Sequence, residues 1–117
     1  MAGTQTERAH ERQDQPGESA REYLDRYGRM RLIRRFEQEI HRLFLKGEVH
    51  GTTHLSAGQE AIPVGVCSAL QPDDYVAGTY RGHGHALAKG TDPEALAAEM
   101  LGRATGCLLY TSDAADE

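Results

Sequence analysis

A regularly spaced series of apolar side chains between residues 23 and 44 constrains the fold of this chain more than any other feature. Such steps of three and four residues place side chains on one face of an α-helix. Ser19 followed by Glu22 forms a capping-box pattern before the series, and Gly47 is a suitable helix stop after it. We therefore predict a long amphipathic helix whose apolar face packs in a core. The series consists of Tyr23, Tyr27, Met30, Ile33, Phe36 (or Glu37), Ile40, Leu43 and Phe44.

The flanking composition limits the folded part of the chain. Residues 1–22 contain no Val, Ile, Leu, Phe or Tyr, and we expect them to be disordered because they cannot bury enough apolar surface. Net charge is −5 with no long basic run outside residues 29–35, which argues against a nucleic-acid partner. No apolar run approaches the ~20 residues of a membrane span. Two cysteines without metal or disulfide spacing fit a reducing cytoplasm, so we expect a cytoplasmic protein.

A second and a third helix are predicted further along. Ser56 and Gln59 repeat the capping-box pattern, which predicts a helix from there to about residue 70. Pro63 lies inside that stretch and conflicts with a regular helix. Asp92 followed by Pro93 is a typical helix start, and this helix should run to about residue 103.

Between these helices, residues 71–74 predict a turn and residues 75–77 a short strand. The order helix, helix, strand, helix with short links is typical of the opening of an α/β domain. We therefore predict an α/β fold that is mostly helical in the part present, with the rest of the sheet outside this sequence. A lone core of this size is marginal, so a partner or a longer chain is expected.

Residues 79–85 (TYRGHGH) carry the strongest functional signal. Arg81 can make two parallel hydrogen bonds to a phosphate. Gly82 and Gly84 would let a ligand approach the backbone closely, and the two histidines titrate near neutral pH. The segment therefore predicts a site for a phosphorylated anion in which protons also move.

Three blocks together carry a family resemblance. They are residues 53–61 (THLSAGQEA), residues 80–85 (YRGHGH) and residues 102–106 (GRATG). In sequence and spacing they resemble the N-terminal part of the α subunit of thiamine-diphosphate-dependent 2-oxo acid dehydrogenases, the E1 component. The resemblance covers roughly residues 30–106, so residues 23–106 are interpreted as a partial E1 α domain that binds thiamine diphosphate.

The resemblance implies an activity and its partners. It implies oxidative decarboxylation of a small 2-oxo acid, most simply pyruvate, with acyl transfer to a lipoyl group on an E2 core. Acetoin and branched-chain 2-oxo acids are the alternative substrates. An E1 β subunit would complete an α2β2 heterotetramer and supply the carboxylate that activates the cofactor, which acts as electron sink.

Site residues carry over one by one. Tyr80 and Arg81 match the family pair that binds the cofactor diphosphate. His54 matches a histidine that lines the 2-oxo acid pocket, so His54 and Tyr80 are expected to contact substrate. His54 and His83 are the expected catalytic residues, able to hydrogen-bond the substrate or move a proton. Packing is the expected role of His85, and capping and interface packing that of Gln59 and Glu60.

A different class of function remains open from the residues alone. Four histidines, two of them spaced as in His83-x-His85, could hold a transition metal in a small binding module. The other two are His50 and His54. No carboxylate or cysteine pattern accompanies them, so this is the weaker alternative.

The last eleven residues do not continue the family pattern. Residues 107–117 (CLLYTSDAADE) resemble a translated adapter from sequencing-library preparation, and we expect a non-native tail. The family's metal loop, Gly-Asp-Gly followed by an Asn, has no match here, so ligands for Mg²⁺ are expected beyond a truncation at residue 106. We therefore expect no metal ligands in this chain, and expect the chain to be inactive alone.

Overall fold

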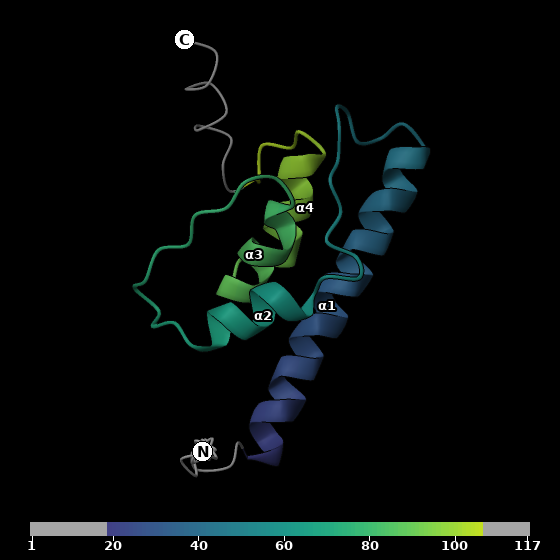
Figure 1. Ribbon diagram of the computed structural model, residues 1–117. Helices are drawn as coiled ribbons and strands as arrows, with labels where there is room; N and C mark the ends of the chain where they lie inside the picture. Colours follow the sequence, from purple (N-terminus) through teal and green to yellow (C-terminus); the bar gives the residue numbers. More distant parts are fainter. Residues whose placement is uncertain (1–18, 107–117) are drawn as a thin grey trace, which may run out of the picture.

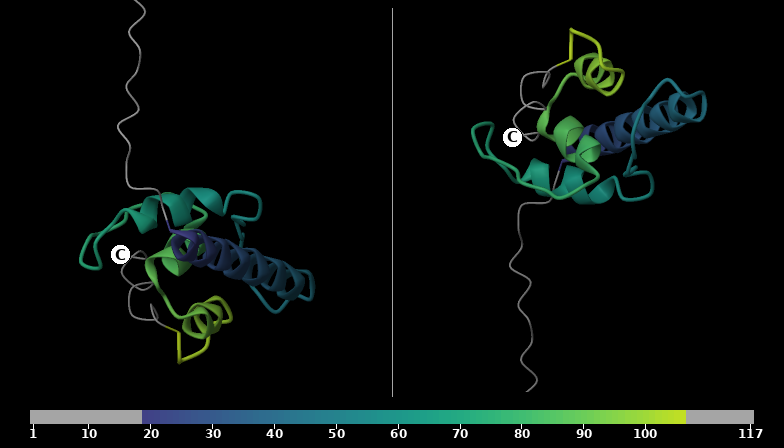
Figure 2. Two further views of the ribbon diagram at one scale, coloured as in Figure 1. Left: turned by 90° about the horizontal axis from the view of Figure 1, so that it is seen from below. Right: turned by 90° about the horizontal axis from the view of Figure 1, so that it is seen from above.

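The computed structural model describes residues 19–106. Within that range lie four helices joined by loops: α1 (Ala20–Leu45), α2 (Ala61–Ser68), α3 (Gly82–Lys89) and α4 (Pro93–Met100) (Figure 1). The long helix α1 forms one side of the molecule, and the short helices α2 and α3 pack against its middle. Two opposite views show α3 between α2 and α4 (Figure 2). This arrangement puts α3 at the centre, in contact with both α1 and α2.

The predicted helix over the first apolar series is confirmed as α1. The hydroxyl of Ser19 accepts a hydrogen bond from the backbone N–H of Glu22 at 3.3 Å, and the Glu22 carboxylate accepts one from the Ser19 N–H at 2.7 Å. Gly47 takes φ +76° just after the helix, a conformation that favours glycine. Helix α1 begins at Ala20, inside the segment expected to be disordered, while residues 1–18 lie outside the described residues.

The core lies where α1 meets the short helices. Tyr23 and Tyr27, which the spacing placed on the buried face, are 61% and 57% exposed. The physical reason is that α2 and α3 cover the middle of α1 and leave its first turns uncovered. The apolar series is therefore buried only in its middle, from Ile33 to Ile40, and Phe44 at its end is 39% exposed. The buried cluster consists of Ile33, Phe36, Ile40, Val64, Leu87, Ala88 and Leu96.

Helix α2 is shorter than predicted. It begins at Ala61, and the Ser56 hydroxyl donates to the carbonyl oxygen of Arg81 instead of capping the helix. Pro63 is then the third residue of the helix, in the first turn, where its missing N–H would have had no partner within the helix. Pro63 therefore fits the observed helix, because the helix begins five residues after the predicted start at Ser56.

The predicted strand over residues 75–77 is wrong. No residue between 19 and 106 is in a strand, and the side chain of Tyr75 is fully exposed in a loop that leads to α3. An extended segment needs a neighbouring strand to satisfy its backbone groups, and the described part of the chain offers none. The described residues are thus mostly helical, as predicted.

Helix α3 was missed because two glycines and two histidines make its first half a poor helix former. Gly84 lies inside it, and a Cβ there would be 3.0 Å from Oγ of Ser56 and 3.3 Å from Cγ of Pro63. Gly84 thus allows α2 and α3 to pack closely, a role that the sequence did not predict for it.

Helix α4 begins as predicted. The Asp92 carboxylate accepts a hydrogen bond from the N–H of Ala95 at 3.0 Å, and Pro93 is the first helical residue. The helix ends at Met100, three residues before the predicted end. Among residues 19–106, no helix combines the length and the apolar content that a membrane span requires.

Candidate functional site

The loop before α2 and the start of α3 meet at the predicted site residues. A cavity of about 260 Å³ is lined by His54, Tyr80, Arg81 and His83, and also by His50. A second cavity of about 460 Å³ lies beside it and shares His54 and Arg81. The structure therefore brings together all four residues that the sequence assigned to cofactor, substrate and catalysis. Among the described residues, no Asp or Glu lines either cavity.

Tyr80 contacts both of its predicted neighbours. Its ring centroid is 4.7 Å from that of His54, with the planes tilted by 42°. The guanidinium carbon of Arg81 is 5.9 Å from the Tyr80 ring centroid, within range of a cation–π interaction. Tyr80 contacts both His54 and Arg81. Because Tyr80 is 65% exposed, a ligand can still reach it.

Arg81 has an unusual backbone conformation. It takes φ +67° and ψ +34°, and it is the one residue other than glycine with positive φ between residues 19 and 106. Its carbonyl oxygen accepts from the Ser56 hydroxyl at 3.1 Å and lies 3.3 Å from Nδ1 of His85. Its guanidinium Nη1 donates to the carbonyl oxygen of Leu55. These contacts hold a left-handed residue that ordinarily costs about 1–2 kcal/mol.

The start of α3 adds hydrogen-bond donors to the site. Arg81 is the N-cap residue of α3, and its side chain makes no capping hydrogen bond. The first backbone N–H groups of a helix have no partner within the helix and carry partial positive charge. A guanidinium, a phenol and an open helix start therefore lie together, as anion recognition requires.

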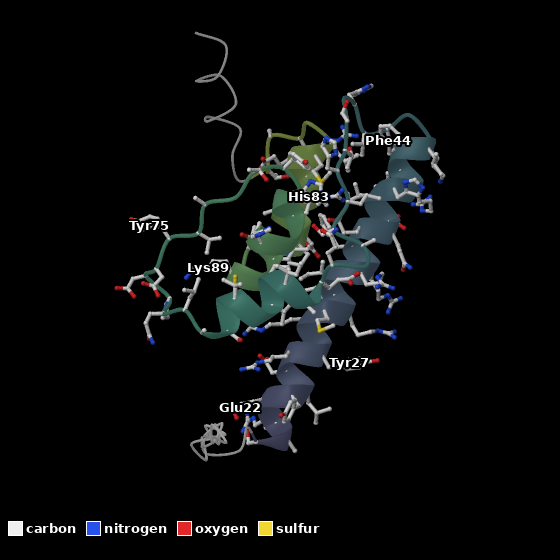
Figure 3. All side chains as sticks on the ribbon, in the orientation of Figure 1. Glu22, Tyr27, Phe44, Tyr75, His83 and Lys89 are labelled. Atoms are coloured by element: carbon white, nitrogen blue, oxygen red, sulfur yellow. The ribbon has the colours of Figure 1, made fainter. Side chains whose placement is uncertain are left out.

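A buried carboxylate beneath the site was not assigned a role from the sequence. Glu37, on α1, has 0% exposure. It accepts a hydrogen bond from the N–H of Ser56 at 2.9 Å, and Nδ1 of His83 lies 3.2 Å from its other oxygen. The His83 ring also meets Phe36 edge-on at 6.2 Å. His83 thus faces α1 from α3 (Figure 3).

A sequence signal for Glu37 did exist. It lies four residues after Ile33 and three before Ile40, on the apolar face of the helix. A carboxylate is rarely found fully buried unless it has partners. An acid in the middle of an apolar series is therefore a sign that hydrogen-bond donors arrive from elsewhere in the fold.

Glu60 forms the second buried acidic site. Both of its carboxylate oxygens bind the Arg34 guanidinium, and the N–H of Gly58 donates to one of them at 3.0 Å. The hydrogen bonds from Arg34 lower the pKa of Glu60 from 4.5 to about 2. Glu60 therefore ties the loop before α2 to α1 as a carboxylate. Glu60 is the N-cap residue of α2, but its side chain makes no capping hydrogen bond, which corrects the expected capping role.

The four histidines do not form a metal centre in the described structure. His50, His54 and His83 line the smaller cavity, but His85 directs Nδ1 towards the Arg81 carbonyl. Between residues 19 and 106, no group of three or more His, Cys, Asp or Glu side chains could hold a metal ion.

Comparison with known proteins decides the family. The family model of the dehydrogenase E1 component matches residues 28–114. This chain belongs to the dehydrogenase E1 component family. The resemblance inferred from the three sequence blocks is thereby confirmed. The match extends into residues 107–117, which lie outside the described residues, so the non-native tail stays a prediction.

Curated relatives of this E1 chain include α subunits of two enzymes. It is 49% identical over 80 residues to the acetoin:2,6-dichlorophenolindophenol oxidoreductase subunit α of Bacillus subtilis, covering 68% of this chain and 24% of the relative. It is 50% identical over 86 residues to the pyruvate dehydrogenase E1 component subunit α of Zymomonas mobilis, covering 73% and 24%. The chain thus spans about a quarter of the length of these relatives. No solved structure matches it.

The dehydrogenase E1 family is dependent on thiamine diphosphate, and the residues of this E1 chain fit the diphosphate end of that cofactor. Arg81 provides a planar set of donors and Tyr80 a hydroxyl, and the first N–H groups of α3 have no partner within the helix. With no acid among the described lining residues, a doubly charged anion would meet no like charge in either cavity.

Proposed function

We propose that this chain is part of the α subunit of a pyruvate dehydrogenase E1 component. The observation that carries this proposal is the position of Arg81 and Tyr80 at the open start of α3, beside His54 and His83. Family membership and the similarity to pyruvate dehydrogenase α subunits support it. The reaction is the oxidative decarboxylation of pyruvate, with acyl transfer to a lipoyl group on E2.

The cofactor contacts come from the start of α3. Arg81 and Tyr80 bind the diphosphate of thiamine diphosphate, and the first N–H groups of α3 complete its hydrogen bonds. The constrained backbone of Arg81 fixes the direction in which its side chain leaves the main chain. Little conformational entropy of the backbone is therefore lost when the ligand binds. Bound thiamine diphosphate would supply the electron sink for loss of carbon dioxide.

The two histidines act on substrate and protons. His54 lies against Tyr80 and donates a hydrogen bond to the substrate carboxylate. His83 moves a proton at the ring nitrogen that does not meet Glu37. An E1 β subunit in an α2β2 assembly and a Mg²⁺ ion held by residues outside the described range complete the proposed enzyme.

Acetoin is the second candidate substrate. Two α subunits of acetoin:2,6-dichlorophenolindophenol oxidoreductases, from Bacillus subtilis and Cupriavidus necator, are 49% and 46% identical to this chain over 80 residues. These identities are similar to the 50% found for the pyruvate relative. The choice between the two substrates therefore needs a direct experiment.

Cofactor binding is tested on the 117-residue chain by nuclear magnetic resonance titration with thiamine diphosphate. We expect shifts at the backbone N–H groups of residues 82–84 and at the Arg81 side chain. Thiamine without phosphates is the matched ligand and should shift none of them. Arg81→Met should abolish the response. Equal shifts with thiamine, or a response unchanged by Arg81→Met, would contradict the proposed diphosphate contact.

The substrate is tested with chimeric enzymes. Residues 28–106 replace the aligned segment of the Zymomonas mobilis α subunit, which is then expressed with its own β partner. We expect turnover of pyruvate, and its loss with Arg81→Met. The same segment placed in the Bacillus subtilis acetoin enzyme is the comparison. Activity retained there and lost in the pyruvate enzyme would favour acetoin.

A further inference from the structure

We infer that Glu37 is a positioning residue that fixes the hydrogen of His83 on Nδ1 and leaves Nε2 as a proton acceptor for the ligand cavity. The inference rests on the proposed function, in which His83 moves a proton. The family match and the names of the relatives give Glu37 no role. Three observations carry it: the burial of Glu37, the identity of its two partners, and the place of His83 in the cavity wall.

The burial of Glu37 determines what its oxygens can do. A fully buried carboxylate is costly unless donors satisfy it, and an ionised carboxylate only accepts hydrogen bonds. The N–H of Ser56 satisfies Oε1 at 2.9 Å. The partner of Oε2 is Nδ1 of His83 at 3.2 Å. That ring nitrogen must therefore carry the hydrogen.

The tautomer of His83 follows from this contact. A neutral imidazole has one N–H and one acceptor nitrogen, and the partner of one nitrogen sets the state of the other. With the hydrogen on Nδ1, Nε2 has a free lone pair. No hydrogen bond to Nε2 of His83 occurs among residues 19–106, and the ring lines the cavity of about 260 Å³. Nε2 is thus the nitrogen left for a ligand.

The same carboxylate also supports the cofactor side of the site. Ser56 donates its N–H to Glu37 and its hydroxyl to the Arg81 carbonyl. Glu37 therefore contacts the catalytic candidate His83 through one hydrogen bond. It is connected to the anion-binding candidate Arg81 through two hydrogen bonds, both made by Ser56. This places a single buried group beneath both halves of the site.

The first test measures the tautomer of His83 directly. The full 117-residue chain, labelled with ¹⁵N in its histidines, is studied by long-range ¹H–¹⁵N spectra above about pH 8, where imidazoles are neutral. We expect His83 to carry its hydrogen on Nδ1. An Nε2–H form of His83 in the unmodified chain would overturn the inference without any variant.

Glu37→Gln then tests the cause. The amide oxygen can still accept from Ser56, but the amide NH₂ now faces Nδ1 of His83 and needs an acceptor there. We expect His83 to switch to the Nε2–H form. His85 is an internal reference, since its Nδ1 meets a carbonyl oxygen and should keep its hydrogen in both proteins. A His83 that stays Nδ1–H beside an unchanged His85 would overturn the inference.

Two further measurements separate this inference from the proposed function. Glu39→Gln, on an exposed carboxylate that pairs with Arg42, should leave both histidines unchanged. In the Zymomonas mobilis chimera, Glu37→Gln should lower kcat about 100-fold while thiamine diphosphate affinity stays the same. If His83 shows the expected tautomers but thiamine diphosphate does not bind, the proposed function alone is contradicted. Binding with the opposite tautomer would contradict the role of Glu37 alone.

Discussion

The hydroxyl group of Ser56 donates a hydrogen bond to the carbonyl oxygen of Arg81 over 3.1 Å. It joins the loop before α2 to the N-cap of α3, and Nδ1 of His85 reaches the same oxygen at 3.3 Å. Together these contacts hold Arg81 at φ +67°. A residue with a side chain in this conformation is under strain, and such strain persists only where the surrounding structure holds the residue in place.

The strain at Arg81 predicts that a glycine and an alanine variant at this position differ in stability but not in binding. Arg81→Gly and Arg81→Ala should both lose the response to thiamine diphosphate, because both remove the guanidinium. Arg81→Gly should nevertheless unfold with a free energy about 1 kcal/mol higher than Arg81→Ala, since glycine adopts positive φ without strain. Urea denaturation measures the difference. Equal stability of the two variants would show that the left-handed conformation is not required.

The ion pair between Glu60 and Arg34 predicts a loss of stability in acid. Because Arg34 lowers the pKa of Glu60 from 4.5 to about 2, the pair contributes stability above pH 4.5, and this is lost as the pH falls through about 2. The contribution is at most about 3.5 kcal/mol, since each pKa unit corresponds to about 1.4 kcal/mol, and solvent around the half-exposed Arg34 reduces it. Urea denaturation between about pH 6 and pH 2 measures it.

The ion pair is tested with Glu60→Gln at the buried acid, and Glu39→Gln at an exposed acid is the control. Glu60→Gln should lower stability at neutral pH and flatten the decline in acid. Glu39→Gln removes an exposed pair with Arg42 and should leave the free energy of unfolding nearly unchanged, because solvent screens exposed ion pairs. A decline that Glu60→Gln leaves unchanged would assign the acid sensitivity to other carboxylates.

The close packing at Gly84 predicts that one added methyl group would push α2 and α3 apart. Gly84→Ala should destabilise the chain by about 1–3 kcal/mol, because the new Cβ would meet Ser56 and Pro63. Gly65→Ala is the control: it lies in a helix, nothing is within 4 Å of its Cβ, and it should stabilise by about 0.5–1 kcal/mol. Thermal unfolding followed by circular dichroism distinguishes the signs. Destabilisation by both variants would contradict the described packing.

The ring contact between Tyr80 and His54 predicts separable roles for the phenol. Tyr80→Phe keeps the ring that lies 4.7 Å from His54, so the His54 proton shifts should be preserved while thiamine diphosphate binds several-fold more weakly. Tyr80→Leu should change both. Histidine proton spectra and calorimetric titration measure the two effects. Full affinity in Tyr80→Phe would exclude the hydroxyl as a diphosphate donor.

Local signals predicted the elements that carry their own caps. Helices α1 and α4 begin where Ser19 and Asp92 were expected to cap them, because those hydrogen bonds form within three residues. The start of α2 could not be predicted in this way, since the Ser56 hydroxyl binds Arg81, 25 residues away. Helix α3 has weak intrinsic propensity and depends on packing against α1 and α2.

The site residues also divide into those that nearby sequence predicts and those that depend on distant residues. Tyr80 and Arg81 are adjacent in sequence, and the family resemblance assigned His54 and His83 to the same site. All four line one cavity. Glu37 received no role because its partners are 19 and 46 residues away. A periodic pattern reports which face of a helix is buried, but not which donors the rest of the fold brings to it.

The wide separation of the partners of Glu37 along the chain also sets an order of assembly. While the polypeptide is being synthesised, α1 emerges first with Glu37 still hydrated, and both of its partners exist only once residue 83 has been added. Contacts of such long range form late, after the entropic cost of closing the intervening loops. The cavity of about 260 Å³ is thus complete only after α3 has docked and α4 has brought Met100 to its wall. A ligand bound there would hold the late-forming half of the molecule closed by mass action.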